Sequence, residues 1–146
     1  MKKSILLAFL TLFLSACHFE VSDNGDLDGF WQLYSEDTLS SGQSADMRQS
    51  GIYWAVQMRL LSIEAKKQNI RFLFRFTHEG STLRLYDPRV DFRPSFGERA
   101  DTAVTCADSL HFLGLNSLDE SFFVEELNSS RMTLRNDSLR LYFRRY

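Results

Sequence analysis

The chain contains 146 residues, with 17 Lys and Arg against 19 Asp and Glu, which gives a formal net charge of -2. A mildly acidic chain lacks the basic surplus that binding to phosphates requires, so nucleic acid is not an expected partner. The length suits a single domain with one buried core.

The N-terminus has the layout of a secretory signal. Lys2 and Lys3 precede roughly a dozen apolar residues. This run is shorter than the about 20 apolar residues that a membrane-spanning helix needs, and a polar, acidic segment follows it. We therefore predict that residues 1–16 form a cleaved signal peptide.

The apolar run ends in Leu14-Ser15-Ala16-Cys17, which resembles the lipobox of bacterial lipoproteins. The resemblance implies that the Cys17 thiol is lipidated, that the signal is cut before Cys17 and that the new amine is acylated. Several acyl chains hold a protein firmly on a membrane, at about 0.8 kcal/mol per buried methylene. It also implies a lipid-anchored protein of the cell envelope, and His18 after the cysteine resembles the pattern that permits outer-membrane sorting. The periplasmic and surface sides both stay open, and the alternative is an ordinary signal peptide that ends near a cysteine.

The segment after Cys17 carries no periodic apolar pattern. Residues 17–28 include Ser22-Asp23-Asn24-Gly25-Asp26, a polar run with turn-forming residues, and we predict a flexible tether there. With Cys17 lipidated, Cys106 has no intramolecular partner, so stability is expected to come from the core rather than from a disulfide.

From residue 29 onward, apolar and polar residues alternate with period two, which indicates half-buried strands. One long strand is expected over residues 52–64, where the apolar phase changes near Leu60, and a bulge there would explain the change. The eight predicted strands cover residues 29–37, 52–64, 70–77, 82–85, 101–106, 121–127, 132–135 and 139–144.

The connections between these strands are short. Turns are predicted at residues 78–81, 128–130 and 136–137, and links of this length join antiparallel strands rather than parallel ones. Eight such strands predict an all-β, antiparallel up-and-down barrel, which leaves no exposed edge. At most one short helix is expected, at residues 109–116, with Asp108 or Ser109 as its cap.

Gly29-Phe30-Trp31 resembles the G-x-W of the first strand of lipocalins, and residues 29–146 look like the lipocalin-like domain of small Gram-negative lipoproteins. The resemblance implies that Trp31 plugs the closed end of the barrel and that a basic residue of the last strand packs across its ring. Arg144 or Arg145 is the available cation, and Gly29, Trp31 and Arg144 make up the expected base motif. The chain lacks a clear T-D-Y stretch and a disulfide pair, so pocket details are not carried over from the larger lipocalins.

An eight-stranded barrel is either filled by its own side chains or holds one small ligand. The strand phase points five large side chains inward, where they either line a pocket or form a packed core: Trp54, Met58, Phe72, Phe74 and Phe76. The long segments 40–51 and 87–108 are candidates for covering the barrel mouth, and long loops in compact domains are usually functional or mobile.

Support for catalysis is thin. Cys106, Asp108 and His111 lie close in sequence and allow a thiol–imidazole interpretation, but a small buried cysteine at a strand end is the commoner case. The three histidines are too scattered for a metal site, and no cofactor motif occurs. We therefore expect neither an enzyme nor a metal or cofactor. The outward-facing arginines are expected to be ordinary surface charges: Arg71, Arg75, Arg84, Arg140 and Arg144.

Two functions follow. The first is a non-enzymatic, membrane-tethered protein that holds a small apolar or amphipathic ligand inside the barrel. The second is an accessory envelope lipoprotein with a solid barrel, which binds another envelope protein through its loops or outer face. We expect a monomer in either case, and the volume of the barrel interior is the observation that separates the two functions.

Overall fold

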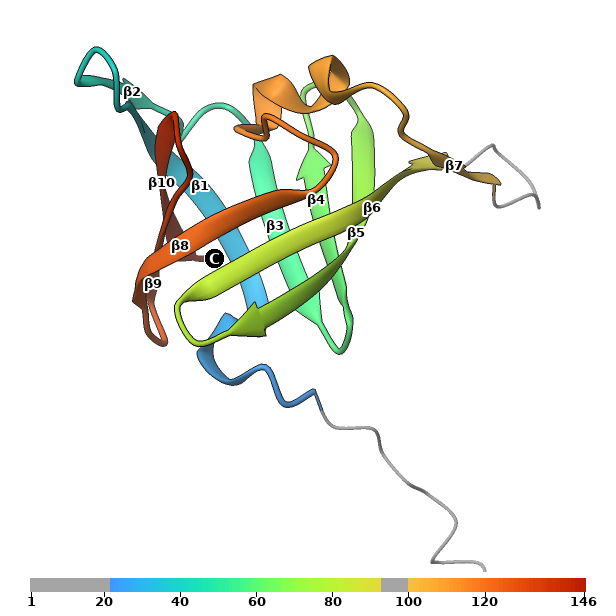
Figure 1. Ribbon diagram of the computed structural model, residues 1–146, viewed down its shortest axis with the longest axis horizontal. Coiled ribbons are helices and arrows are strands. Elements are labelled where there is room, and N and C mark those ends of the chain that lie inside the picture. Colours follow the sequence, from blue (N-terminus) through green and yellow to red (C-terminus); the bar gives the residue numbers. More distant parts are fainter. Residues whose placement is uncertain (1–21, 93–99) are drawn as a thin grey trace, which may run out of the picture.

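The computed structural model describes residues 22–92 and 100–146, so Cys17 and residues 1–16 lie outside the described residues. Ten strands and two short 3-10 helices follow one another along this part of the chain (Figure 1). The strands are β1 (Gly29–Thr38), β2 (Gln43–Asp46), β3 (Ile52–Gln57), β4 (Leu60–Ala65), β5 (Ile70–Glu79), β6 (Thr82–Phe92), β7 (Ala100–Ala103), β8 (Glu120–Leu127), β9 (Arg131–Arg135) and β10 (Leu139–Arg145). The 3-10 helices are η2 (Gly25–Leu27) and η3 (Ala107–Leu113).

Eight of these strands close into a ring of antiparallel pairs. The order around the ring is β1, β3, β4, β5, β6, β8, β9 and β10, and β10 pairs with β1 to complete it. Strand β2 adds to the upper half of β1, and β7 adds to β6. In Figure 1, β6 and β8 cross in front of β1 and β3, with η2 at the lower end and η3 at the upper end. The prediction of an all-β, eight-stranded antiparallel barrel is confirmed.

The single strand expected over residues 52–64 is wrong. The chain reverses at Met58 and Arg59, and β3 pairs with β4 from Gln57 opposite Leu60 to Ile52 opposite Ala65. Met58 takes a positive φ of 56° to make this turn. A tight reversal changes the apolar phase along the chain just as a bulge does, because facing residues such as Val56 and Leu61 then share the inner side.

Part of the expected loops is strand. Residues 40–51 contain β2, β6 extends to Phe92, and the weak strand expected at 101–106 is β7, which ends at Ala103. Strand β6 tolerates Pro88 because Pro88 lies at the irregularity where the β5 to β6 register shifts between Leu73 and Arg75. A proline has no N–H to give to the ladder and is accepted in such bulges.

The predicted helix at residues 109–116 is the 3-10 helix η3, which starts and ends earlier. Cys106 holds its N-cap position, and no side chain caps it, so neither Asp108 nor Ser109 has the expected role. The helix ends at Gly114, whose φ of 80° is left-handed. A Cβ at Gly114 would lie 3.1 Å from Leu141 Cδ2, so glycine also lets the end of η3 approach β10 closely.

Candidate functional site

The lower end of the barrel is closed by Trp31. Its side chain is fully buried, and its Nε1 donates a hydrogen bond of 2.9 Å to the Leu27 carbonyl of η2. The Arg145 guanidinium lies 4.5 Å from the centre of the indole ring, and its Nη1 and Nη2 donate to the carbonyls of Asp28 and Asp26. Arg145 thus covers the ring and ties η2 to β10.

The cation over Trp31 is Arg145, so the assignment of Arg144 to the base motif is wrong. The register decides this, because Trp31 pairs with Arg145 whereas Arg144 pairs with Gln32. Gly29 belongs to the motif for a steric reason: it has a φ of 130°, and a Cβ there would lie only 2.3 Å from Arg145 Nη1.

The end of the expected tether is part of the folded base. Leu27 is buried, and Ser22 Oγ and Asn24 Nδ2 both donate to Asp28 Oδ1, at 2.6 and 2.7 Å. The same two side chains also bind the backbone of Met58 at the turn between β3 and β4. Residues 22–28 therefore belong to the folded domain, ahead of the expected start at Gly29.

The five side chains expected to line a cavity separate into two groups. Trp54, Phe72 and Phe74 are buried in the barrel, and Phe76 is partly buried against the same core. Met58 does not point inward: it occupies the turn between β3 and β4 and is 41% exposed. Three of the five line grooves that also include exposed surface residues: Met58 and Phe76 line one groove, and Phe74 lines another.

Large side chains pack against one another in the barrel interior. Trp54 lies at the centre, with its ring 4.8 Å from Phe143 and 6.0 Å from Phe122 between centroids. The interior core is one continuous cluster whose largest members are Trp31, Trp54, Phe72, Phe74, Phe122 and Phe143. Within the described residues, Trp54 Nε1 is the one buried side-chain polar atom without a hydrogen-bond partner.

The 3-10 helix η3 and the residues after it pack on the upper end of the barrel (Figure 1). Leu110, Leu113 and Leu115 are fully buried. The carboxylate of Glu120, itself buried, accepts hydrogen bonds from the backbone N–H groups of Asn116 and Ser117 and from Asn136 Nδ2. This buried network joins η3 and the residues after it, which we call the plug, to β8 and to the turn between β9 and β10. The spacing of Leu110 and Leu113 indicates a helix, but the sequence did not show that this helix packs on the upper end of the barrel.

The thiol–imidazole arrangement is absent from the described contacts. Cys106 is exposed, and His111 faces Asp108 at 3.9 Å on the solvent side of η3. No group of three potential metal ligands occurs within residues 22–92 and 100–146. In the same residues, no helix combines the length and hydrophobicity needed to cross a bilayer.

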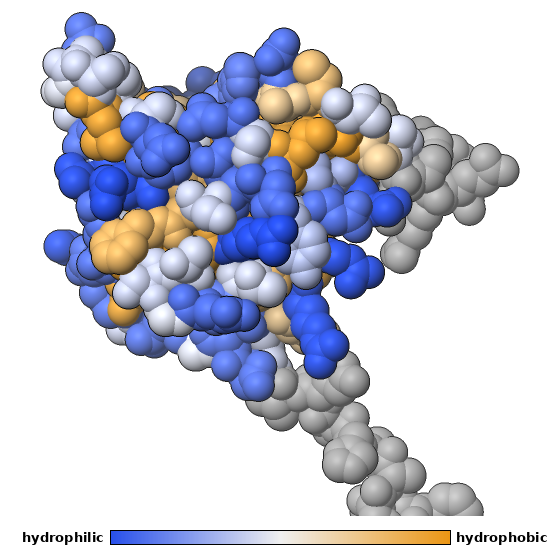
Figure 2. Space-filling model, viewed as in Figure 1, coloured by the Kyte–Doolittle hydropathy of each residue, from blue (hydrophilic) through white to orange (hydrophobic). Residues whose placement is uncertain are grey.

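Most of the outward-facing arginines are neutralised by carboxylates. Arg71 pairs with Glu64 and Asp91, Arg84 with Asp119, and Arg75 with Asp87. On β9 and β10, Arg135 and Arg140 both bind Glu125, and these bonds, that of Arg140 above all, hold the pKa of the Glu125 carboxyl below its usual range. On the face in Figure 2, hydrophilic residues predominate and hydrophobic ones form small, separate patches.

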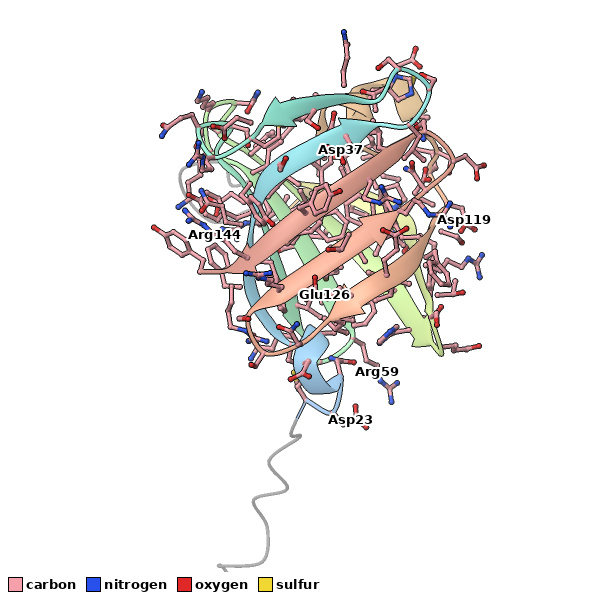
Figure 3. The ribbon with its side chains drawn as sticks, turned by 90° about the vertical axis from the view of Figure 1, so that its left-hand side faces the viewer. Asp23, Asp37, Arg59, Asp119, Glu126 and Arg144 are labelled. Atoms are coloured by element: carbon pink, nitrogen blue, oxygen red, sulfur yellow. The ribbon has the colours of Figure 1, made fainter. Side chains whose placement is uncertain are left out.

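One outer groove is different, and we call it the arginine groove. It has a volume of about 910 Å³ and lies outside β1, β2, β9 and β10. Its lining residues are Tyr34, Ser35, Ser44, Ala45, Asp46, Arg48, Ser130, Arg131 and Arg144. Three arginines and one aspartate give it a formal charge of +2 in a chain whose net charge is -2. Arg144 lies at the edge of this face in Figure 3.

The charges in the arginine groove are not equivalent. Arg48 and Asp46 bind each other through several hydrogen bonds, which lower the pKa of Asp46 to about 2. Arg144 Nε donates to Gln32 Oε1 at 2.9 Å, and no described carboxylate lies within ion-pair distance of Arg144 or Arg131. Sequence reasoning missed this site because β1, β2 and β10 supply it from opposite ends of the chain.

Comparisons with known proteins agree with this architecture. The model of a lipocalin-like domain family matches residues 12–146. A lipocalin-like protein from Bacteroides uniformis is 18% identical, with a TM-score of 0.61 over 84% of this chain and 100% of that chain. An uncharacterized protein from Bacteroides eggerthii is 16% identical, with a TM-score of 0.55 over 82% of this chain and 98% of that chain. The comparison with curated proteins gives no match. This chain belongs to the family of lipocalin-like domains.

Proposed function

We propose that this protein is a non-enzymatic, membrane-anchored binding protein whose barrel is a solid platform and whose binding surface is the outer face. The lipocalin-like fold supports a binding role in general. The observation that carries the proposal is the burial of large side chains at both ends, Trp31 under Arg145 below and Leu110 and Leu113 above. A ligand in the interior would have to displace these side chains, whereas the outer grooves are open.

The proposed anchor is the acylated Cys17 in the cell envelope. Ser22, the first described residue, is hydrogen-bonded to Met58 at the lower end of the barrel. Five residue steps separate Cys17 from Ser22, and an extended chain covers at most about 3.6 Å per residue, or about 18 Å here. The lower end would therefore face the bilayer, and the end with η3 and the outer faces would be presented to other molecules.

A second candidate is a small ligand in the interior, and one observation favours it. The buried indole Nε1 of Trp54 has no partner among the described residues, and an unpaired buried donor costs about 1–3 kcal/mol. A ligand acceptor atom would satisfy it. The surrounding Phe122 and Phe143 rings leave this candidate weaker than the first.

Two measurements test the proposal. The first is titration of the purified protein with a fluorescent fatty acid. We expect no saturable binding, and stoichiometric displacement of the probe by other lipids would overturn the solid-barrel proposal. The second compares the wild type with Cys17→Ser by membrane fractionation and intact mass. We expect the variant to leave the membrane fraction and to lose the acyl mass, and an unmodified wild-type Cys17 would overturn the anchor.

A further inference from the structure

We propose that the arginine groove binds a carbohydrate that carries a phosphate or a carboxylate, with Arg131 and Arg144 as the anion-binding residues. The inference rests on the proposed function, since it assigns a place and a ligand chemistry to binding on the outer face. The ladder of β9 and β10 brings two pairs of arginines opposite each other, Arg140 with Arg135 and Arg144 with Arg131.

The two arginine pairs differ in how their charge is compensated. Glu125 lies between Arg135 and Arg140, with one carboxylate oxygen 2.9 Å from Arg135 Nε and the other 2.6 Å from Arg140 Nε. In the described part of the chain, no carboxylate takes this position between Arg131 and Arg144. Like charges directly opposite on neighbouring strands are destabilising. An anion bound between these two guanidinium groups would compensate their positive charge, as Glu125 compensates that of the other pair.

The groove holds Arg144 in place for such a ligand. Gln32, which is 5% exposed, accepts the hydrogen bond of Arg144 Nε and donates from its own Nε2 to the Arg48 carbonyl at 3.1 Å. This bond uses one of the five N–H groups of the guanidinium and fixes its plane, so its remaining donors are available for a phosphate or carboxylate. Gln32 is thus a positioning residue. Asp46 does not compete for Arg131 or Arg144, because Arg48 Nε donates to its Oδ1 and Arg48 Nη2 to its Oδ2.

The remaining lining indicates what carries the anion. Three serine residues, Ser35, Ser44 and Ser130, line the groove together with Tyr34. Their hydroxyl groups donate to the Ala45 carbonyl, Asp37 and Asn128, so toward a ligand they act as acceptors. Sugar hydroxyls supply the matching donors, and an aromatic residue offers an apolar face on which a sugar ring packs. The volume of about 910 Å³ is far larger than an inorganic anion needs and falls in the range of small-molecule sites. A charged sugar unit fits both the chemistry and the size.

The test is calorimetric titration of the purified protein with glucose 6-phosphate, glucuronate and neutral glucose. We expect the two anions to bind and glucose to bind at least tenfold more weakly. Arg131→Gln and Arg144→Gln should each weaken anion binding about tenfold or more, because each removes charge-assisted hydrogen bonds to the anion. Arg135→Gln is the matched control, since it removes an arginine from the same strand outside the groove, and it should leave binding unchanged. Equal binding of all three sugars, or equal loss in Arg135→Gln, would overturn the inference.

A second variant separates a ligand site from a purely structural arginine pair. Arg131→Glu supplies a carboxylate opposite Arg144, so we expect it to raise the melting temperature without ligand and to abolish the further rise that glucose 6-phosphate produces in the wild type. A ligand-induced rise that persists in Arg131→Glu would overturn the inference.

Vesicle binding identifies the source of the anion. Binding to phosphatidylglycerol vesicles with no binding to the free sugars would assign the same groove to a lipid headgroup, provided that Arg131→Gln removes it. If neither the anionic sugars nor the vesicles bind, the proposal of a ligand site in the arginine groove is wrong. The solid-barrel proposal is unaffected by that result, because the fluorescent fatty acid tests it separately.

Discussion

Phe122→Ala tests whether the interior is packed. Phe122 is 1% exposed and packs edge-to-face on Trp54 at the centre of the barrel. Removal of a buried phenyl ring leaves a cavity on the order of 100 Å³, which at about 24 cal/mol per Å³ costs about 2.4 kcal/mol. The lost transfer of the ring out of water adds about 2 kcal/mol. We therefore expect a loss of about 4 kcal/mol in the free energy of unfolding, measured by urea denaturation followed by circular dichroism.

The neighbouring residue on the same strand gives the control. Phe123 is 48% exposed and lies 5.6 Å from the Arg135 guanidinium on the outer face, so Phe123→Ala should cost less than about 1 kcal/mol. Phe122→Ala should also acquire saturable benzene binding, because an apolar cavity in a packed core binds small apolar molecules, whereas the wild type should not. Equal costs for the two substitutions, or benzene binding by the wild type, would refute the packed interior.

Three further predictions concern the barrel base and one half-buried carboxyl. Gly29→Ala should cost about 2 kcal/mol, because its φ of 130° strains an L-residue and its Cβ would displace the Arg145 guanidinium; thermal unfolding that matches the wild type would contradict this. Arg145→Gln should lower the free energy of unfolding by about 1–2 kcal/mol through loss of the contact with Trp31, and Arg144→Gln should lower it clearly less. Urea denaturation measures both values, and a larger loss in Arg144→Gln would restore Arg144 to the base motif. Partial burial raises the pKa of Glu36 above its usual value, so its charged form opposes folding at neutral pH. Glu36→Gln should therefore melt higher than the wild type at pH 7 and equally at pH 3.5, and a difference that persists at pH 3.5 would exclude this cause.

The barrel could be predicted because its strands show their inner and outer faces in sequence. Alternation places Trp54, Phe72 and Phe74 correctly, since burial of one face of a sheet requires period two. The same reasoning fails where the strand register or a turn decides which way a side chain faces. Arg144 and Arg145 are neighbouring residues of the same type, and only the pairing of Trp31 with Arg145 shows which of them covers the indole ring. Met58 continues an apolar pattern that a tight turn interrupts.

The arginine groove was beyond prediction for a different reason. Tyr34 and Arg144 come from opposite ends of the chain and meet only because β10 pairs with β1. The sequence identifies Arg140 and Arg144 alike as surface arginines, and their difference depends on Glu125, which lies on β8 and reaches only one of the two. The plug residues Leu110 and Leu113 likewise show an apolar pattern but not which end of the barrel they close.

A barrel interior filled by the protein's own side chains has no room for an apolar probe. Methyl-resolved NMR of the purified protein during titration with 1-aminoanthracene measures whether such a probe enters. We expect the methyl groups of Leu110, Leu134 and Leu141, all fully buried, to keep their chemical shifts up to the solubility limit of the probe. Saturable shifts confined to these methyl groups would show that the interior binds the probe, and the solid barrel would be wrong.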